Sequence, residues 1–355
     1  MSHAYVNKVV TAVPPHDVHQ KFSDLAPRLI NTRHGQIIFK RMALRSHIEH
    51  RYSYLVPYDE TARDSSDVFY RFGHFADTAK RMQFYQEHAF TLAKAALDKL
   101  DLSEIRDSIT HLIVTSCTGF YAPGLDLQIV EHYGLRSDVE RTIIGFMGCY
   151  AAFNALKMAR HIVRSQPDAR VLTLNLELCT IHLQETEDLE ELLSFLIFAD
   201  GCAASLISAK AQGVRLDSFY STVIPDCKEQ ITWTIGSTGF DMVLSGKVPF
   251  TIAHAVPPQI DRILGGKTVM DMRHWVIHPG GRSILDTIQK SFALSDASME
   301  PSRKVLRDYG NMSSATVMFV MKALLESKNT VGLGCAMAFG PGVTVESMLF
   351  TRLEA

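Results

Sequence analysis

The chain has 355 residues, of which 46% are hydrophobic, so it can bury a large core as one big domain or as two fused ones. Its formal net charge is −2 and it has no long lysine–arginine run, which argues against a nucleic-acid partner. Its six cysteines form no CxxC pair, which favours reduced thiols in a cytoplasmic protein over a zinc site, and no stretch reaches the ~18 apolar residues of a membrane span.

Short apolar segments rich in β-branched residues alternate with helical patterns along the chain. The expected strands cover residues 111–116, 141–146, 170–178, 203–207, 275–277, 332–339 and 343–350. The expected helices cover residues 84–100, 125–133, 151–163, 189–196, 282–292 and 313–327. This alternation indicates an α/β fold with a largely parallel sheet covered on both faces. The more polar stretch 209–225 is the best candidate for a boundary between two units.

Cys149 lies where a predicted strand meets a predicted helix, in the string Phe146-Met147-Gly148-Cys149-Tyr150. The free N–H groups and the dipole at a helix N-terminus favour negative charge. We therefore expect the thiol to have a lowered pKa and to be a nucleophile. A small buried cysteine that only packs is the alternative, and this stretch alone does not decide between the two.

Two later segments supply partners for the thiol. His278 ends a predicted strand, just before a Pro-Gly-Gly turn and a helix. Asn311 opens another helix, where asparagine is also a good N-cap, and the cap is the simpler interpretation of this residue in isolation. Taken together, cysteine, histidine and asparagine at three helix starts suit a thiol nucleophile, a base or cation, and an amide donor. We expect them to converge on one reaction centre.

Five strings give the chain its resemblance to the type III polyketide synthases, the chalcone synthase-like branch of the thiolase superfamily. They are Gly148-Cys149, Phe198-Ala199-Asp200-Gly201, His278-Pro279-Gly280-Gly281, Gly310-Asn311-Met312-Ser313-Ser314-Ala315, and Phe339-Gly340-Pro341-Gly342 with Thr344-Val345-Glu346. They occur in the family's order and at its spacing. The resemblance implies a thiolase-like, five-layered αβαβα fold with two similar halves. Residues 1–211 would carry the cysteine, and residues 212–355 would carry the histidine and the asparagine.

The same resemblance implies an acyltransferase activity. The enzyme would load an acyl-CoA starter on Cys149 and extend it by decarboxylative condensation with malonyl-CoA. Cys149 would act as a thiolate beside a protonated His278, while His278 and Asn311 would donate hydrogen bonds to the enolate oxygen. The substrates are CoA thioesters, and no metal or other cofactor is expected. The family forms homodimers, so we expect one here, and an acyl carrier protein is a possible donor of the starter.

Further positions are assigned by their match to the family's motifs. Phe198 matches an aromatic gatekeeper, and the second gatekeeper position holds Met242; an ordinary core aromatic is the alternative for Phe198. Arg41 and Arg45 match CoA-binding basic residues, although a solvated basic face would look the same, and Ser283 falls beside the pantetheine arm. The remaining cavity positions fall on Cys117, Cys179, His182, Trp233, Gly340 and Pro341, and His182 is expected to be a satisfied core histidine.

The product class is predicted from two segments, 116–120 and 232–242, which resemble bacterial members of the family. Those members often take fatty acyl starters and make alkylpyrones or alkylresorcinols. We therefore expect a fatty acyl starter and a pyrone or resorcinol-type product. The alternatives are a synthase of the tetrahydroxynaphthalene type that uses malonyl-CoA alone, and a 3-ketoacyl-ACP synthase of fatty acid initiation. A thiolase or a non-catalytic lipid-binding protein fits the motifs less well.

Overall fold

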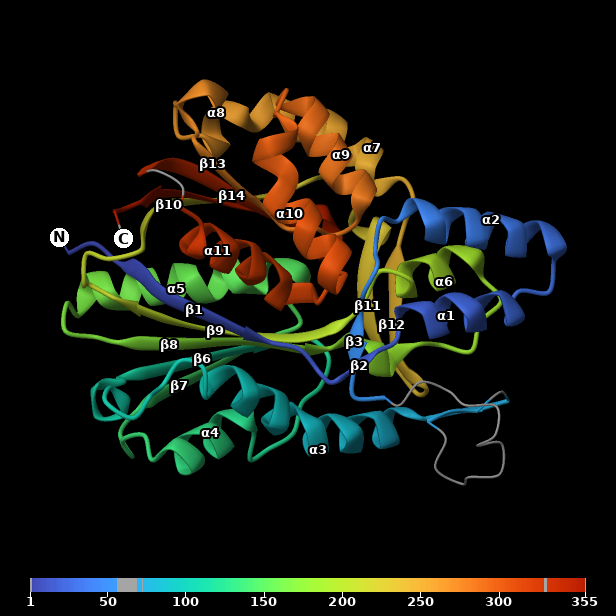
Figure 1. The fold of residues 1–355 in the computed structure, drawn as a ribbon, viewed down its shortest axis with the longest axis horizontal. Coiled ribbons are helices and arrows are strands. Elements are labelled where there is room, and N and C mark those ends of the chain that lie inside the picture. The colour runs from blue at the N-terminus through green and yellow to red at the C-terminus, as the bar shows by residue number, and fades with distance from the viewer. Residues whose placement is uncertain (1, 56–68, 72, 329–330, 355) are drawn as a thin grey trace.

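The computed structural model describes residues 2–55, 69–71, 73–328 and 331–354 (Figure 1). In this part of the chain, nine strands form one hydrogen-bonded sheet of order β13-β14-β15-β10-β1-β9-β8-β6-β7. The strands of its first half are β1 (Tyr5–Ala12), β6 (His111–Ser116), β7 (Glu140–Gly145), β8 (Val171–Leu178) and β9 (Asp200–Ser208). Those of its second half are β10 (Val214–Val223), β13 (His274–Ile277), β14 (Gly332–Gly340) and β15 (Thr344–Arg352).

The same strand pattern occurs in both halves of the sheet. In the first half β6 and β8 are parallel, and β9 is antiparallel to both β8 and β1. In the second half β13 and β14 are parallel, and β15 is antiparallel to both β14 and β10. The halves meet where β1 pairs with β10, at Tyr5↔Arg215 and Val6↔Val214. Two similar halves are thus present, while the boundary at residue 211 stays a prediction.

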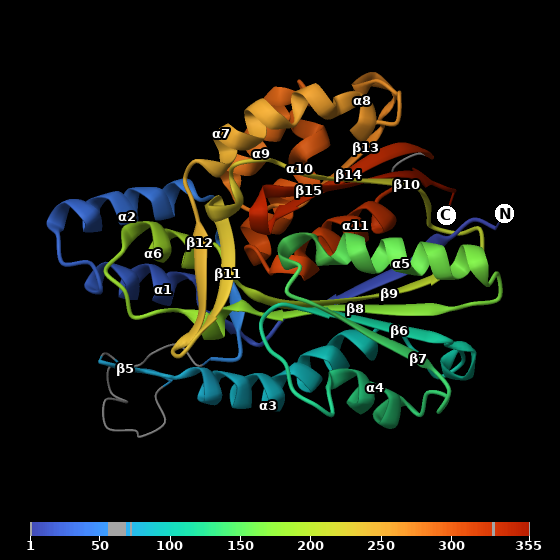
Figure 2. The ribbon, with the colours of Figure 1, turned by 180° about the vertical axis from the view of Figure 1, so that it is seen from behind.

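The helices complete a five-layered arrangement. Helices α5 (Ala151–Ser165) and α11 (Thr316–Glu326) lie between the two halves of the sheet (Figures 1 and 2). Their buried residues share one hydrophobic core with residues of both halves. The outer faces are covered by α3 (Thr78–Leu97) and α4 (Leu125–Tyr133) on one side, and by α7 (Val248–Ala255), α8 (Ile260–Ile263), α9 (Arg282–Ser291) and α10 (Asp296–Tyr309) on the other. The expected thiolase-like α/β fold is confirmed.

Several sequence-based expectations need correction. The sheet is mixed and not largely parallel, because β9 and β15 run back against β8 and β14. Strand β10 lies inside the polar stretch 209–225, and its pattern is weak because part of one face stays exposed. Helix α10 was not predicted because it is mostly polar and buries few residues; Ser295 caps its start by accepting from the Ser298 N–H at 3.2 Å.

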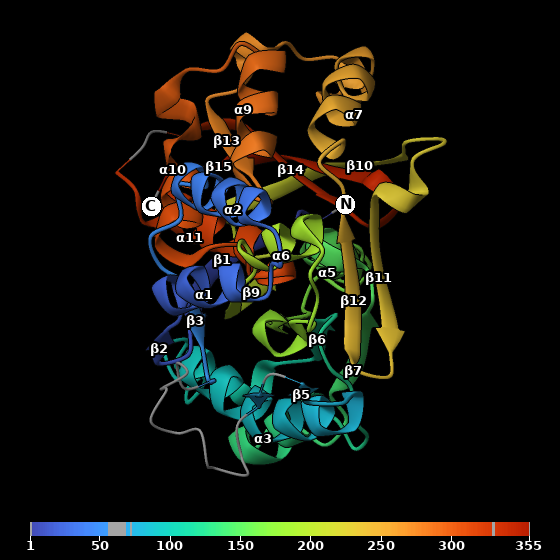
Figure 3. The ribbon, with the colours of Figure 1, turned by 90° about the vertical axis from the view of Figure 1, so that its right-hand side faces the viewer.

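Smaller elements gather at one end of the molecule, where they cover the ends of several core strands (Figure 3). They are the helices α1 (His19–Leu25), α2 (Arg33–Arg45) and α6 (Leu189–Phe195), the hairpin of β11 (Ile231–Gly236) and β12 (Gly239–Leu244), and the short pairs β2 (His16–Asp17) with β3 (Tyr52–Ser53) and β4 (Tyr70–Arg71) with β5 (His74–Phe75). None of the described helices is both long and apolar enough to cross a bilayer.

Candidate active site

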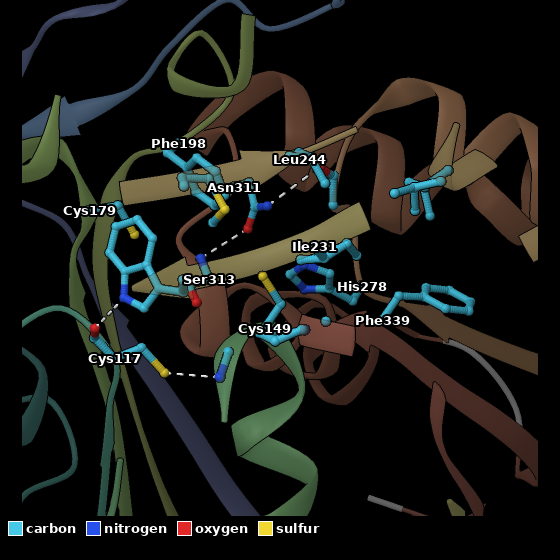
Figure 4. Close-up of a pocket in the computed structure, with 18 of the residues that line it drawn as sticks. Cys117, Cys149, Cys179, Phe198, Ile231, Leu244, His278, Asn311, Ser313 and Phe339 are labelled. Carbon is cyan, nitrogen blue, oxygen red and sulfur yellow. Dashed lines mark hydrogen bonds between the residues drawn. The ribbon is translucent and has the colours of Figure 1, made fainter. Parts of the chain in front are cut away.

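A cavity lies where the two halves of the molecule meet the β11–β12 hairpin, and its empty space, including open solvent at the mouth, is about 730 Å³. Cys149, His278 and Asn311 all line it, although they come from three distant segments. Figure 4 shows the Cys149 sulfur pointing between the His278 ring and the Asn311 carboxamide. Most of the remaining lining is apolar or aromatic and includes Phe195, Ile231, Leu244, Val248, Ile284 and Phe339.

A tight turn after β7 presents Cys149 to the cavity. Cys149 lies in a single 3-10 turn, Gly148–Tyr150, directly before α5. Gly148 has a φ of +72°, and a Cβ at this position would lie 2.2 Å from Pro341 Cδ, so only glycine fits. The Gly148 N–H also donates to Cys117 Sγ at 3.0 Å. The glycine thus locks the turn against two segments of the cavity wall.

His278 follows β13 and is held by its backbone. Its N–H donates to the Met337 carbonyl at 2.8 Å, and its own carbonyl accepts from the Gly280 N–H at 2.9 Å. The side chain is buried, and neither ring nitrogen has a hydrogen-bond partner among the described residues. Buried polar groups are nearly always paired, so an unpaired imidazole in the lining of a cavity indicates a site for a ligand or reacting group.

The Asn311 carboxamide is oriented by α11. Its Oδ1 accepts from the Ser313 N–H at 2.9 Å and from the Thr316 hydroxyl at 3.2 Å, while Nδ2 makes a long contact of 3.4 Å to the Gly280 carbonyl. These bonds tie the oxygen to the start of the helix and leave the amino group turned towards the cavity. The N-cap interpretation of Asn311 is wrong, because Met312 is the N-cap of the turn Ser313–Ala315 and Ala315 that of α11, whereas the role of amide donor stays a prediction.

The electrostatics differ from the expectation for a helix N-terminus. Burial raises the pKa of Cys149 to about 11, although the facing side chains of Ser313 and Asn311 act to lower it. Burial also lowers the pKa of His278 to about 3. Both shifts favour the uncharged forms, because charge is poorly solvated in this pocket. The expected lowered pKa of Cys149 is wrong for the ligand-free protein, since desolvation outweighs the effect of one short turn.

The gatekeeper and wall positions mostly reach the cavity. Phe198, Met242, Cys117, Cys179, Trp233, Gly340 and Pro341 all line it. Phe198 is joined to Asn311 by a parallel β-bridge, which connects the gatekeeper to a candidate catalytic residue. Trp233 pairs with Met242 across the hairpin, and its Nε1–H donates to the Cys117 carbonyl at 2.7 Å. This bond fixes the indole against the cavity wall.

His182 is placed behind the cavity and not in its lining. Its Nε2–H donates to the Thr118 carbonyl at 2.7 Å, and its Nδ1 accepts from the Phe240 N–H at 3.1 Å. Its ring stacks on Phe240 with centroids 4.2 Å apart and meets Trp233 edge-on. Burial lowers the pKa of His182 to about 3. Both ring nitrogens are used, as expected for a satisfied core histidine.

The three candidate CoA-binding residues lie outside the cavity lining. Arg41 and Arg45 are exposed on α2, and Ser283 is exposed at the start of α9. Arg282 donates to the Arg45 carbonyl at 3.0 Å, which brings the end of α2 beside the start of α9. Gly280, just before α9, and Ile284, in its first turn, line the cavity, so the end of α2 lies near the rim of the cavity.

Sequence reasoning missed Glu177, a carboxyl group buried beneath the site. Its Oε2 accepts from the Cys117 N–H and the Thr118 hydroxyl, both at 2.9 Å, and its Oε1 accepts from the Ser314 hydroxyl at 2.6 Å. Burial raises its pKa to about 7 despite these three donors. The signal was a single acidic residue inside the apolar strand Val171–Leu178. Glu177 ties the Cys117 segment to the start of α11.

The chain matches two models of one protein family over nearly its whole length. Residues 2–211 match the family model for the N-terminal domain of chalcone and stilbene synthases, and residues 215–354 match the model for their C-terminal domain. The chain is 35% identical over 300 residues to the alpha-pyrone synthesis polyketide synthase-like Pks18 of Mycobacterium tuberculosis, covering 80% of this chain and 75% of the relative. It is 31% identical over 376 residues to bisdemethoxycurcumin synthase of Oryza sativa, covering 98% and 92%.

Two solved structures share the fold over nearly their whole length. The C-terminal type III polyketide synthase domain of Steely1 from Dictyostelium superposes with a TM-score of 0.90 at 24% identity, covering 99% of this chain and 100% of that one. The polyketide synthase PKS-I of the brown alga Ectocarpus siliculosus gives a TM-score of 0.88 at 26% identity, covering 99% of each chain.

Proposed function

Since the chain belongs to the chalcone and stilbene synthase family, the type III polyketide synthases, we propose that it is a decarboxylating acyltransferase that loads a starter on Cys149 and extends it with malonyl-CoA. One observation carries this proposal: Cys149, His278 and Asn311 converge on a single cavity, and both ring nitrogens of His278 are free of partners among the described residues. A sulfur, an imidazole and an amide donor around one cavity suit the transfer of an acyl group through a covalent thioester.

Loading begins from a neutral pair, because burial keeps the thiol protonated and the imidazole uncharged. As Cys149 Sγ attacks the carbonyl carbon of the starter thioester, its proton passes to His278. The carbon–sulfur bond to CoA then breaks, and the departing CoA thiolate takes the proton from His278 and leaves as free CoA. The starter remains on Cys149 as a thioester.

Extension requires an enolate. When malonyl-CoA loses CO₂, the electron pair of the broken carbon–carbon bond stays on the acetyl fragment, whose oxygen becomes negatively charged. The Asn311 Nδ2–H and a His278 ring N–H are the proposed donors to this oxygen, and one such donor is worth roughly 2.7–4 kcal/mol. The enolate carbon attacks the thioester and displaces the Cys149 thiolate. The lengthened chain, carried on CoA, is then reloaded on Cys149 or cyclised.

For the starter, we propose a fatty acyl-CoA and a pyrone or resorcinol-type product. The support is the apolar lining beyond Cys149 and the name of the alpha-pyrone-synthesising relative. A carrier protein remains the alternative donor of the starter. The test is product analysis by mass spectrometry after incubation with malonyl-CoA and starters from acetyl to stearoyl, each offered on CoA and on a carrier protein. Preference for short or aromatic starters contradicts the fatty acyl proposal, and absence of any extended product contradicts the synthase itself.

One observation favours a second candidate, a synthase that uses malonyl-CoA alone. The Trp233 indole is bonded to the Cys117 carbonyl and lies 5.7 Å from Phe240 between ring centroids, so a fixed bulky ring fills part of the cavity that Cys149 also lines. A tetrahydroxynaphthalene-type product formed without added starter supports this candidate. The 3-ketoacyl-ACP synthase alternative is disfavoured, because both halves of the chain match the chalcone and stilbene synthase models.

We also propose a homodimer. Phe120 and Ile143 are 38% and 46% exposed, and Phe120 stacks on Phe146 with centroids 5.4 Å apart. These apolar side chains flank the Ala122-Pro123 turn, and exposed apolar clusters of this kind mark protein–protein contacts. Ala122 is too small to project far into a partner's cavity. Light scattering on a size-exclusion column tests the proposal, and a monomer at micromolar concentration contradicts it.

A further inference from the structure

A buried arginine lies behind the wall of the cavity that carries the gatekeeper. Arg51 is 2% exposed and does not line the cavity. We propose that Arg51 is a positioning residue, which holds Phe198 and Asn311 in the arrangement needed for malonyl-CoA decarboxylation. This inference rests on the proposed function, because it concerns the decarboxylation step of that reaction.

The Arg51 guanidinium is bonded directly to the gatekeeper segment. Its Nη1 donates to the carbonyls of Phe195 and Phe198, at 2.9 and 2.6 Å. These carbonyls belong to residues 195–199, which run from the last residue of α6 to the residue before β9. Hydrogen bonds from a charged donor are stronger than those between neutral groups. Two such bonds to carbonyls of one short segment fix the direction of the backbone between them.

The same segment is bonded to Asn311 on its other side. The Asn311 N–H donates to the Ile197 carbonyl at 2.8 Å, and the Asn311 carbonyl accepts from the Ala199 N–H at 2.9 Å. Phe198 lies between these two bonds. Arg51, the gatekeeper segment and the backbone of Asn311 therefore form a continuous chain of hydrogen bonds, and a shift of the segment would move both cavity residues.

Arg51 also packs directly on Gly310, the residue before Asn311. Gly310 has a φ of +69°, and a Cβ there would lie 2.8 Å from Arg51 Cγ and 2.9 Å from the Ile197 carbonyl. The arginine stem thus packs on the backbone immediately before Asn311. On its outer side, Arg51 Nε donates to His19 Nδ1 at 3.0 Å, and the guanidinium lies 4.8 Å from the centre of the Phe22 ring.

The charges around Arg51 favour a geometric role over a stabilising one. Burial lowers the pKa of Arg51 to about 10, so it stays charged at neutral pH, and Asp200 nearby partly offsets this shift. Burial raises the pKa of Asp200 to about 7, although the Thr180 N–H at 2.8 Å and the Thr180 hydroxyl at 2.7 Å both bond to its carboxyl oxygens. Arg51 Nη2 is buried without a partner among the described residues. The bonds that Arg51 does make are directed at one segment, so they fix the position of that segment.

The test compares two half-reactions of the whole protein in three variants. Arg51→Met removes the hydrogen-bond donors but keeps an unbranched side chain of similar length. Arg51→Lys keeps a positive charge that can reach the carbonyls. Arg352→Met is the matched control. Arg352 is also a buried arginine, 5% exposed, and its Nη1 donates to the Ser327 hydroxyl at 2.7 Å away from the cavity lining. Starter loading on Cys149 is followed by intact-protein mass spectrometry, and decarboxylation by acetyl-CoA formed from malonyl-CoA alone.

We expect Arg51→Met to lower kcat for decarboxylation by about thirtyfold, because a displaced Asn311 loses part of its hydrogen bond to the enolate oxygen, while loading, which does not use that donor, changes less than about threefold. Arg51→Lys should recover part of this loss. Arg352→Met should lower the melting temperature but leave the ratio of the two rates unchanged. If Arg51→Met leaves that ratio at the wild-type value, or if Arg352→Met changes it equally, the positioning role is overturned.

A milder variant keeps the proposal testable if Arg51→Met does not fold. His19→Ala removes only the acceptor of Arg51 Nε, and we expect a decarboxylation loss of roughly threefold to tenfold with unchanged loading. An unchanged ratio in His19→Ala then overturns the inference. A wild-type protein that makes no acetyl-CoA from malonyl-CoA overturns the proposed function together with this inference, whereas an active wild type with an equally active Arg51→Met overturns the inference alone.

Discussion

Replacing Asn311 by alanine should separate the two half-reactions. The side chain is 2% exposed, its oxygen is bonded to Ser313 and Thr316, and its amino group is the proposed donor to the enolate. Without that donor, decarboxylation of malonyl-CoA should slow by about 10²–10³-fold, which corresponds to roughly 2.7–4 kcal/mol. Loading of Cys149 should change far less, because thioester formation does not need the amide.

The substitution also has a structural cost that must be told apart from the chemical one. Asn311→Ala leaves the buried Ser313 N–H without its acceptor, which costs about 1–3 kcal/mol of unfolding free energy. Thr316→Val is the matched control, because it removes the hydroxyl contacts of Thr316, at 3.2 Å to Asn311 Oδ1 and at 2.9 Å to the Ser313 carbonyl, and leaves the Asn311 amino group in place. It should lower stability by about 1 kcal/mol and decarboxylation by less than about fivefold.

Acetyl-CoA release from malonyl-CoA, acyl loading by mass spectrometry and urea unfolding together measure these quantities. The reasoning is refuted if Asn311→Ala decarboxylates within tenfold of the wild type, or if Thr316→Val loses as much decarboxylation as Asn311→Ala. The second result would mean that helix stability, and not the donor, controls the step.

Three further predictions follow from single contacts. Gly148→Ala should cost more than about 2 kcal/mol in urea unfolding and abolish acyl loading, because its Cβ would lie 2.2 Å from Pro341 Cδ at a φ of +72°. Trp233→Ala frees space in the cavity and should shift the products, measured by mass spectrometry, to longer chains; an unchanged product profile contradicts this. Burial raises the pKa of Glu177 from 4.5 to about 7, so between these pH values the folded protein holds a proton on Glu177 that the unfolded chain has released. Relative to Glu177→Gln, the unfolding free energy of the wild type should therefore fall by up to about 3 kcal/mol as the pH rises from about 4.5 to 7. A difference that does not change with pH would contradict the burial argument.

The sequence was informative where local motifs carry the chemistry. Cys149, His278 and Asn311 each belong to a short sequence motif that lies just before a helix, and all three line the cavity. The α/β alternation predicted the fold class, and the resemblance predicted the five layers. Strand direction was predicted wrongly, because an apolar run looks the same in a parallel or antiparallel pair.

Residues that act through tertiary contacts left no comparable signal. Arg51 bonds carbonyls 144 and 147 positions away, and nothing near it in the chain marks that contact. Glu177 was visible only as an acid in an apolar strand, and its three donors come from two other segments. The direction of the Cys149 pKa shift also depends on burial, which a helix-start argument does not contain.

Peptide mapping of the acyl-enzyme tests the central claim most directly. Wild-type protein and Cys149→Ala are each incubated with an acyl-CoA starter. One portion of each is digested and examined by mass spectrometry, and a second, undigested portion is given malonyl-CoA. We expect one thioester, on Cys149, and no extended product from the variant. A starter found on Cys117 or Cys179, or extended product made by Cys149→Ala, would contradict the account.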